Sequence, residues 1–328
     1  MPSYLTGKRV LVTGATGSFG KLFIDRLLNQ TQVSSVVAFS RDELKQFEMQ
    51  AEFLSSKLEF ALGDVRDFSR VLQVTKDVDV VIHAAAMKQI PASEKNPMEA
   101  IKTNILGAEN IVNASIANQV EKVVALSTDK AANPANLYGA TKLCSDKLMI
   151  AGNYLSKSSS TSIAVVRYGN VLGSRGSVIP FFQKCAVSGK IPITDNRMTR
   201  FWLTLNQGVS LVLNAIESMH GGEIYVPKIP SFKVIDVARI VAPGIPTYEI
   251  GIRPGEKLHE VMITEDDSYF TRDLRDYYVI LSPQLKDSGV YTKVSSSVRE
   301  GFTYRSDTNE LWFDDESFIT LLGESNIL

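Results

Sequence analysis

The sequence predicts an α/β protein: a Rossmann-type, doubly wound parallel sheet with a smaller C-terminal α/β substrate domain. Three observations support this prediction. A glycine-rich turn follows an apolar strand within residues 9–20. Further short, apolar, β-branched runs alternate with helical patterns as far as residue 168, which is typical of parallel strands buried on both faces. At 328 residues the chain is also long for one hydrophobic core, and its pattern loosens after residue 168.

The first strand runs directly into a turn that can hold a dinucleotide. Its glycines follow a G-x-x-G-x-x-G spacing, a relative of the dinucleotide fingerprint. The first glycine permits the tight turn, the second lets backbone N–H groups approach a pyrophosphate, and the third allows helix and strand to pack closely. A glycine-rich turn without a ligand is the alternative. The strand and helix around the turn favour cofactor binding, for which we predict Gly14, Thr16, Gly17, Ser18, Phe19 and Gly20.

The end of the second strand, predicted over residues 34–39, indicates which nicotinamide cofactor is bound. An acidic residue there would bind the ribose 2′-hydroxyl. This strand ends instead in Ser40 and Arg41, with Lys45 one helical turn further on. A hydroxyl and two cations suit a 2′-phosphate, so we predict NADP rather than NAD. Asp42 and Glu43 follow at once and could instead cap the helix predicted over residues 42–54.

Two further strands, predicted over residues 58–62 and 78–83, also end in groups suited to a cofactor. Asp64 could accept a hydrogen bond from the adenine amino group or cap the helix near Phe68, and the sequence leaves both open. Small residues after the strand predicted over residues 78–83 would let a cofactor lie against the backbone, and a cation follows these small residues. The predicted contacts here are Asp64, Val65, Ala84, Ala86 and Lys88.

Two further polar residues belong to the fourth strand and to the helix predicted after it. His83 ends this strand and is predicted to be packed there rather than catalytic. Asn104 lies inside a long helix predicted over residues 97–117, where it is expected to face the cofactor or the substrate.

Residues 122–147, KVVALSTDKAANPANLYGATKLCSDK, combine a buried strand, a polar strand end and the start of a helix. The strand ends in residues 127–130, Ser-Thr-Asp-Lys, and delivers them to the carboxyl edge of the sheet, where ligands of open α/β sheets bind. On the helix that begins after Pro134, Tyr138 and Lys142 are four residues apart and therefore share one face.

The spacing of Tyr138 and Lys142 has a chemical use. A phenol titrates near about pH 10, and an ammonium beside it stabilises the phenolate, which could then act as a base near neutrality. Thr128 or Ser127 could hydrogen-bond the same substrate oxygen. An isolated Y-x-x-x-K pattern is more often an ordinary helical pair, but the polar strand end and the nucleotide-binding turn favour catalysis. We predict that Tyr138 and Lys142 also contact the cofactor.

The loosening pattern suggests how the chain divides. We assign residues 1–168 to an NADP-binding Rossmann domain, to which residues 205–228 return. Residues 169–204 and 229–328 are assigned to a substrate-binding domain.

Polar and basic residues are spread through the loops of this second part. Asn170 follows a strand predicted over residues 163–167, and Arg175, Arg197 and Arg200 come after it. These groups suit a diphosphate-linked substrate, while a solvated surface with salt bridges is the alternative.

Bulk properties exclude several classes of partner. The net charge of -1 provides no electrostatic basis for binding nucleic acid or an anionic membrane. Cys144 and Cys185 match no metal-binding spacing, so we expect no metal and a reducing compartment. With no apolar run of membrane-spanning length and no signal-peptide core in the sequence given, we expect a cytoplasmic enzyme.

Several blocks of the sequence resemble a known family. TGATGSFG and YGATK resemble the short-chain dehydrogenase/reductase superfamily, and RPGEKLHE resembles its extended, nucleotide-sugar-modifying branch. More specific likeness, to the inverting UDP-N-acetylglucosamine 4,6-dehydratases of pseudaminic acid biosynthesis, lies in FSRDELKQFEM, GDVRD, HAAAMKQIPASEKNPMEAIKTNILGAEN, ALSTDKAANPANLYGATKLCSDKL, VRYGNVLGSRGSVIPFF and ITDNRMTRFW. This likeness runs from about residue 7 to residue 260.

The resemblance implies a mechanism for matching residues. Tyr138, assisted by Lys142 and Thr128, would remove the proton from the hydroxyl on sugar carbon 4 as hydride passes to NADP⁺. Lys130 would then take the hydrogen on carbon 5, and Asp129 would protonate the hydroxyl that leaves carbon 6. Dehydratases that retain configuration have T-D-E where this strand end reads T-D-K. A lysine acts as a base only if its pKa is lowered, which burial beside the oxidised nicotinamide could do.

The division of roles between Asp129 and Lys130 is open, because their titrations would be coupled. For Lys130 the alternative to a base is an ion pair with Asp129 or with a substrate phosphate.

The resemblance further implies the product and the substrate contacts. Hydride returns to carbon 6 and a proton reaches carbon 5 from the opposite face, which would give UDP-2-acetamido-2,6-dideoxy-β-L-arabino-hexos-4-ulose with no net redox change. Homo-oligomers, dimers or larger, are also implied. The residues that we predict to contact UDP-N-acetylglucosamine are Lys88, Asn170, Arg200, Arg253 and Glu256.

Three other functions compete with this one. An inverting dehydratase of capsule or O-antigen fucosamine synthesis shares the same first chemical step. A nucleotide-sugar 4-epimerase needs no acid–base pair for carbons 5 and 6, so Asp129 and Lys130 disfavour it. A non-catalytic NADPH-binding scaffold is disfavoured by the intact set of Thr128, Tyr138 and Lys142.

Overall fold

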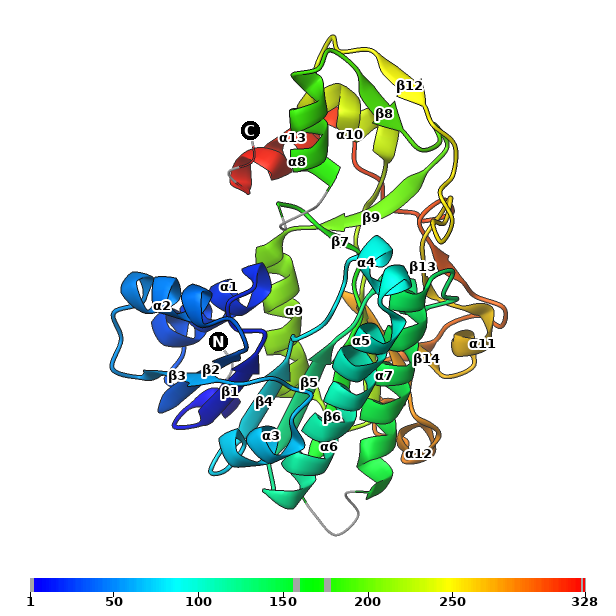
Figure 1. Cartoon of the computed structure of the whole chain (residues 1–328). Helices are drawn as coiled ribbons and strands as arrows, with labels where there is room; N and C mark the ends of the chain where they lie inside the picture. Colours follow the sequence, from blue (N-terminus) through cyan, green and yellow to red (C-terminus); the bar gives the residue numbers. More distant parts are fainter. Residues whose placement is uncertain (1–2, 156–159, 174–177, 326, 328) are drawn as a thin grey trace.

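The computed structural model describes residues 3–155, 160–173, 178–325 and 327, so that Arg175 lies outside the described residues. The larger of its two lobes is built on a ten-stranded sheet with the order β16-β14-β15-β10-β6-β5-β4-β1-β2-β3 (Figure 1). The bounds of these strands are β1 Arg9–Thr13, β2 Ser35–Ser40, β3 Leu58–Leu62, β4 Val80–His83, β5 Lys122–Leu126, β6 Ser162–Val166, β10 Glu223–Pro227, β14 Thr271–Asp273, β15 Tyr277–Leu281 and β16 Ser296–Ser297.

The order of the first six strands confirms the predicted Rossmann-type sheet. They run 3-2-1-4-5-6 with parallel pairing, and β10 adds in parallel to β6. The chain reverses its direction of travel across the sheet between β1 and β4, which pair directly with Val10 opposite Val80. Ligands of such sheets bind beyond the carboxyl ends of the strands at this switch point.

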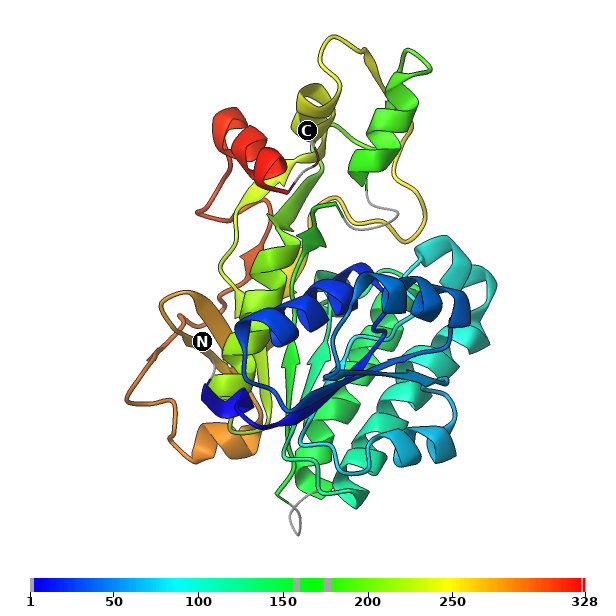
Figure 2. The same cartoon turned by 90° about the vertical axis from the view of Figure 1, so that its left-hand side faces the viewer.

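Helices cover both faces of this sheet, as Figures 1 and 2 show. On one face α3, α6 and α7 pack against one another, and on the other α1 packs against α9. Interior strand residues such as Val10, Leu11 and Val12 are consequently 0% exposed. The helices and short turns of this lobe are η1 Ser3–Leu5, α1 Ser18–Gln30, α2 Glu43–Glu52, α3 Phe68–Val74, α4 Ile90–Lys95, α5 Pro97–Ile101, η2 Lys102–Leu106, α6 Gly107–Ala117, η3 Asp129–Ala131, α7 Leu137–Leu155, α9 Leu205–Ser218, α11 Glu265–Ser268 and α12 Pro283–Asp287.

The predicted helix over residues 97–117 differs from the structure in its middle. It consists of α5 and α6 joined by η2, a π-helical segment over Lys102–Leu106. Asn104 lies in this segment and is 1% exposed. Wider turns of this kind often mark functional sites, because they re-aim one side chain of a helix.

The smaller lobe lies beyond the carboxyl ends of the large sheet, at the top of Figure 1. It has its own hydrophobic core, which includes Trp202, Phe232 and Phe318. Its elements, with the β13–β17 pair below it, are β7 Asn170–Val171, α8 Val178–Ala186, β8 Ile191–Ile193, β9 Thr199–Leu203, β11 Ser231–Lys233, α10 Val234–Val241, β12 Thr247–Glu249, β13 Val261–Ile263, β17 Tyr304–Arg305 and α13 Asp315–Glu324.

The predicted division into domains stays a prediction, but the sheet differs from it in one respect. Within the range 229–328 that we assigned to the second domain, β14, β15 and β16 belong to the large sheet. β15 pairs antiparallel with β10, with Tyr225 opposite Val279. An unpaired edge at β10 would expose its backbone N–H and C=O groups, and β15 covers that edge.

Among the described residues, no helix has the length and apolar character needed to cross a membrane. Within the same residues, no group of three or more His, Cys, Asp or Glu side chains could hold a metal ion.

The small core predicts a separate effect on stability. Phe318 is 0% exposed, and its ring centroid lies 5.8 Å from that of Trp202 and 4.5 Å from that of Phe232. We expect Phe318→Ala to lower the free energy of unfolding of the smaller lobe by about 3–5 kcal/mol, because it leaves a cavity in a packed core.

Denaturant titration followed by tryptophan fluorescence measures this effect, since Trp202 belongs to this core and Trp312 lies beside β11. Ile319→Ala on the same helix is the control, because Ile319 is 48% exposed and its loss should change stability by no more than about 0.5 kcal/mol. Equal effects of the two substitutions would contradict the assignment of Phe318 to the core.

Candidate active site

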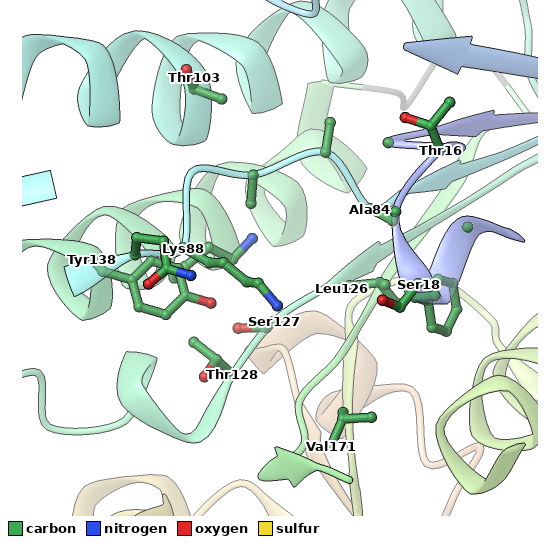
Figure 3. Close-up of a pocket in the computed structure, with 18 of the residues that line it drawn as sticks. Thr16, Ser18, Ala84, Lys88, Thr103, Leu126, Ser127, Thr128, Tyr138 and Val171 are labelled. Atoms are coloured by element: carbon green, nitrogen blue, oxygen red, sulfur yellow. The ribbon is translucent and has the colours of Figure 1, made fainter. Parts of the chain in front are cut away.

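A cavity of about 600 Å³ lies between the two lobes, at the carboxyl ends of the parallel strands. The residues that we predicted to contact the cofactor all line it: Gly14, Thr16, Gly17, Ser18, Phe19, Gly20, Ser40, Arg41, Lys45, Asp64, Val65, Ala84, Ala86, Lys88, Tyr138 and Lys142. Thr128, Asp129, Lys130 and Asn170 line the same cavity. Figure 3 shows Thr16 and Ser18 at one end and Thr128 and Tyr138 at the other.

The glycine-rich turn has the shape that a pyrophosphate site needs. Gly14 has a positive φ of 66°, and a Cβ there would lie 2.9 Å from the backbone of Ala84. A Cβ at Gly20 would lie 2.6 Å from the carbonyl oxygens of Gly14 and Ala15. Among the described residues, no side chain caps the N-terminus of α1 at Gly17. The first N–H groups of this helix, with its positive dipole end, are therefore available to an anion.

The far end of the cavity carries the groups that we predicted to distinguish NADP from NAD. Arg41 is exposed and lies 3.9 Å from Asp64, whereas Lys45 pairs with Asp42. Asp42 caps α2 by accepting from the N–H of Lys45, which is the alternative that we considered for it. Hydrogen bonds from Lys45 lower the pKa of Asp42. Of these two cations, Arg41 has the longer ion pair and is therefore the one better placed to meet a phosphate.

Asp64 does not cap the helix near Phe68. Asp67 is the N-cap of α3 and accepts from the N–H of Arg70 at 3.1 Å. Asp64 instead receives hydrogen bonds from the N–H and guanidinium of Arg66, which outweigh burial and lower the pKa of the carboxyl. The cap interpretation is thus wrong, and a contact with adenine stays a prediction.

His83 is packed as predicted. Its Nδ1 lies 2.9 Å from Oγ1 of Thr13, which also accepts from the N–H groups of Ala84 and Ala85. The hydroxyl proton of Thr13 is therefore directed at Nδ1. Burial, with a smaller effect of Lys142, lowers the pKa of His83 to about 3, so that the ring is neutral and organises the strand end without acting as an acid.

Asn104 does not face the cavity that we expected it to line. Its amide receives a hydrogen bond from the N–H of Met87 at 2.8 Å and donates to the carbonyl of Met87 at 2.9 Å. It also donates to Oγ1 of Thr141 at 2.9 Å. Asn104 therefore fastens the loop that carries Lys88 to helix α7.

Helix α7 is anchored where it enters the site. Asn136 accepts from the N–H of Gly139, and Glu94 accepts from the N–H of Leu137. A Cβ at Gly139 would overlap the carbonyl oxygen of Lys130. The helix and the turn that holds Lys130 can thus pack in direct backbone contact, which places Tyr138 beside the end of β5.

Ser127 and Thr128 have different surroundings. The Ser127 hydroxyl donates to Oδ2 of Asp146 at 2.7 Å, and Arg167 donates to the same oxygen at 3.3 Å. Thr128 donates to Oδ1 of Asp129 at 2.9 Å and faces Tyr138 (Figure 3). Of the two hydroxyls, Thr128 is therefore the one beside the phenol.

The pKa of Tyr138 differs from the expected direction. Burial raises the pKa of Tyr138 to about 12, although the Lys130 ammonium and the nearby Thr128 hydroxyl act to lower it. Burial also lowers the pKa of Lys142, against the effect of Asp146. The expectation of an acidified phenol is therefore wrong for the groups of this chain alone, because desolvation outweighs the charges beside the ring.

Asp129 and Lys130 form an ion pair at the end of β5. Nζ of Lys130 lies 3.0 Å from Oδ1 of Asp129, which is 0% exposed. Burial raises the pKa of Asp129 against the effect of Lys130. Its second oxygen, Oδ2, is buried and has no hydrogen-bond partner among the described residues.

The pKa of Lys130 is raised, whereas we expected it to be lowered. Burial alone would lower it, but the carboxylates of Asp129 and Glu260 outweigh burial and stabilise the ammonium. Oε1 of Glu260 lies 3.2 Å from Nζ of Lys130. Glu260 and Lys257 were not among the predicted site residues, although both belong to the block RPGEKLHE. Their i,i+3 spacing was the available signal, but no local pattern indicates that this block returns to Lys130.

The other predicted substrate contacts lie outside the cavity wall. Arg200 is 8% exposed and donates to the carbonyls of Thr199, Lys257 and Leu258. It therefore holds the backbone at Lys257 and Leu258 in place. Arg253 lies 3.9 Å from Glu256 in the loop before β13. Contacts of these three residues with uridine or phosphate stay predictions.

Comparison with known sequences places this geometry in a family. The model of a family described as polysaccharide biosynthesis protein matches residues 10–282. The chain belongs to the polysaccharide biosynthesis protein family. Two relatives, from different strains of Campylobacter jejuni, are named UDP-N-acetylglucosamine 4,6-dehydratase (inverting). Each is 49% identical in sequence to this chain, over 97% of this chain and 98% of its own length. This bears out the resemblance that the sequence blocks indicated.

Other relatives of this chain have different names. A Rickettsia conorii protein named UDP-glucose 4-epimerase is 42% identical over 83% of this chain and 82% of its own. The solved structure of Pen from Bacillus thuringiensis has a TM-score of 0.92 and 37% identity, covering 99% of this chain and 100% of that one. DesIV from Streptomyces venezuelae, a dTDP-glucose 4,6-dehydratase solved with NAD and TYD, has a TM-score of 0.68 and 21% identity over 76% and 86% of the two chains, and supports the fold alone.

The turn around Gly20 predicts a sharp effect on dinucleotide binding. We expect Gly20→Ala to weaken binding of a nicotinamide dinucleotide at least about tenfold, because the added Cβ would press on the backbone of the pyrophosphate turn. Fluorescence titration with the reduced cofactor measures the dissociation constant.

Gly208→Ala is the matched control. Gly208 is also helical, and a Cβ there would meet its nearest atom, in Leu203, at an ordinary 3.8 Å. Unchanged affinity in Gly20→Ala would refute the assignment of this turn to the cofactor.

Proposed function

We propose that this chain is a carbon-5-inverting UDP-N-acetylglucosamine 4,6-dehydratase that forms UDP-2-acetamido-2,6-dideoxy-β-L-arabino-hexos-4-ulose. The observation that carries this proposal is the Asp129–Lys130 pair, 3.0 Å apart, in the same cavity wall as Tyr138. The two Campylobacter jejuni relatives support the substrate and the stereochemistry. We further propose that the product enters pseudaminic acid biosynthesis, and that the enzyme is a cytoplasmic homo-oligomer.

The residues present fit a nicotinamide dinucleotide, for which NADP is the form that we propose. The turn at Gly14 and Gly17 and the uncapped start of α1 would hold the pyrophosphate, and Arg41 would meet a 2′-phosphate. Ala84 and Ala86 would lie along the cofactor. When bound, this cofactor would supply a hydride acceptor for carbon 4, a hydride donor for carbon 6 and a positive charge beside Tyr138.

The first proton transfer is assigned to Tyr138. Its phenol, beside Thr128 and on the same helix face as Lys142, would take the proton of the hydroxyl on carbon 4. The ketone formed there acidifies the hydrogen on carbon 5. Because burial alone keeps the phenol protonated, ionisation of Tyr138 would depend on positive charge in the cavity.

The elimination is assigned to the Asp129–Lys130 pair. Lys130 would take the proton from carbon 5, and Asp129 would protonate the hydroxyl leaving carbon 6. Burial favours the protonated form of Asp129, which suits an acid. Lys88 and Asn170 also line the cavity, and burial lowers the pKa of Lys88; both are proposed to contact the substrate.

A nucleotide-sugar 4-epimerase is the second candidate, favoured by the Rickettsia conorii relative. Such an enzyme would use Thr128, Tyr138 and Lys142 but would need no proton transfer at carbons 5 and 6. The inverting dehydratase of fucosamine synthesis differs in its later pathway and not in the first product.

Proton NMR with UDP-N-acetylglucosamine in deuterated water tests the proposed reaction. We expect a new methyl signal of a 6-deoxy-4-keto sugar, deuterium at carbon 5 and couplings of the L-arabino configuration. Lys130→Met should slow formation of this methyl group by about 10²-fold or more, because it removes the base. Lys147→Met, at an exposed position of the neighbouring helix α7, is the control and should remain active.

Different products would lead to different conclusions. A methyl signal with D-xylo couplings would keep dehydration but refute inversion and the role of Lys130. Conversion only to the galacto sugar would establish the epimerase, and no conversion after addition of NADP⁺ would contradict both enzyme assignments for this substrate.

Cofactor preference gives a separate prediction. We expect Arg41→Ala to weaken binding of NADP⁺ by about tenfold, the effect of losing one charge-assisted contact with a phosphate. Calorimetric titration with NAD⁺ is the internal control, because NAD⁺ lacks the 2′-phosphate and should bind the variant as it binds the parent protein. Equal loss for both cofactors would refute the specific contact.

A further inference from the structure

Glu260 reaches the Asp129–Lys130 pair from a distant part of the chain. Asp129 and Lys130 form the turn after β5, whereas Glu260 stands directly before β13. Its Oε1 lies 3.2 Å from Nζ of Lys130, and the same nitrogen lies 3.0 Å from Oδ1 of Asp129. Glu260 is 2% exposed. A single ammonium is thus shared between two buried carboxylates.

The backbone of Glu260 is held in place by neighbouring strands. Its N–H donates to Oγ of Ser306 at 2.9 Å, and its carbonyl accepts from the N–H of Ser306 at 2.9 Å. Oγ of Ser306 lies 2.7 Å from Oγ1 of Thr199 in β9. The carboxylate therefore approaches Lys130 from a fixed position and not from a loose loop.

The charged and titratable groups around this contact come from four elements. Asp129 belongs to η3, Tyr138 to α7, Arg200 to β9, and Lys257 and Glu260 to the segment before β13. Arg200 Nε lies 3.6 Å from Oε1 of Glu260, and Lys257 Nζ lies 3.6 Å from Oε2. Burial would raise the pKa of Glu260, but Lys130, Arg200 and Lys257 lower it, so this carboxylate keeps its charge.

Asp129 and Glu260 therefore differ as proton acceptors. Glu260 has two further cationic neighbours that stabilise its ionised form. Asp129 has Lys130 as its cation, and each carboxylate has one oxygen, Oδ2 of Asp129 and Oε2 of Glu260, with no hydrogen-bond partner among the residues described. A proton that leaves Lys130 consequently goes to Asp129 in preference to Glu260.

We propose that Glu260 is a positioning residue for the dehydration, which holds the Lys130 ammonium against Asp129 and directs its proton to that carboxylate. This inference rests on the proposed function, because it concerns the group that takes the carbon 5 proton.

The resulting proton movements balance. An N–H bond of Lys130 breaks and an O–H bond of Asp129 forms, which produces a neutral amine and a carboxylic acid. The amine takes the carbon 5 hydrogen as a proton, the carbon 5 electron pair forms the double bond to carbon 6, and the bond from carbon 6 to oxygen breaks. Asp129 gives its proton to the departing hydroxyl, which leaves as water. The ammonium and the carboxylate are restored, and no electron is gained or lost.

Competitive labelling of Lys130 with acetic anhydride tests this inference without substrate. The holoenzyme is labelled at a series of pH values, and the extent of acetylation of Lys130 is read by peptide mass spectrometry. Only the neutral amine reacts, so the rate follows the fraction of deprotonated Lys130.

We expect Glu260→Gln to react at least about tenfold faster at Lys130 below its pKa, because loss of one neighbouring carboxylate lowers the pKa of this amine by about one unit or more. Lys257→Gln should have the opposite effect, since it removes a cation that repels the ammonium and neutralises Glu260. Glu265→Gln, at an exposed residue of the nearby helix α11, is the matched control and should label like the parent protein.

The pH dependence of kcat/KM gives the second readout. A bell-shaped profile is expected, because the active pair holds one proton; its alkaline limb should move to lower pH in Glu260→Gln and to higher pH in Lys257→Gln. A merely structural role would reduce activity without moving this limb.

The outcomes separate the two proposals. Labelling of Lys130 that is unchanged in both variants, or shifted in the same direction in both, would overturn the role of Glu260 even in an active dehydratase. The predicted labelling shifts in a protein that does not dehydrate UDP-N-acetylglucosamine would refute the proposed function and keep the ionic contact. If Glu260→Gln does not fold, the direction of the shift in Lys257→Gln decides.

Discussion

A parallel sheet that helices cover on both faces has to place its polar groups at the strand ends. The interior residues of β1, β4 and β5 are buried and apolar, so their backbone groups are satisfied by the sheet and their side chains by packing. Thr13, His83 and Ser127 are the first polar side chains beyond these interiors. The cavity, the glycine turn and the start of helix α7 all follow from this constraint, because each meets the sheet at the same edge.

Close backbone contacts bring the parts of the site together at this edge. Gly14 packs against Ala84 across the switch point, and Gly139 packs against the carbonyl of Lys130. Neither contact leaves room for a Cβ. Glycine at these two positions thus determines how near the nucleotide turn lies to the fourth strand, and how near Tyr138 lies to Lys130.

The late segment from Gly255 to Glu260 adds a charged contact to this frame. Gly255 accepts from Asn136, Lys257 donates to the carbonyl of Ala132, and Glu260 pairs with Lys130. Removal of water from these charges costs free energy, which is recovered only when the geometry of the partners is good. Breaking such a buried pair typically costs about 3–5 kcal/mol. The packing of the late segment and the charge state of the Asp129–Lys130 pair are therefore linked.

Local patterns in the sequence were enough to predict the fold class, the glycine-rich turn and many of the residues on the cavity wall. Alternation of apolar strands with helices specifies a parallel sheet, glycine spacing specifies the turn, and i,i+4 spacing places Tyr138 and Lys142 on one face. The return of β14 to β16 to the large sheet, the inward contacts of Asn104 and Arg200, and the position of Glu260 beside Lys130 became visible only in the folded chain. It also reversed the expected pKa directions of Tyr138 and Lys130. These features depend on burial and on charges brought together from residues about 130 positions apart, and no local pattern carries that information.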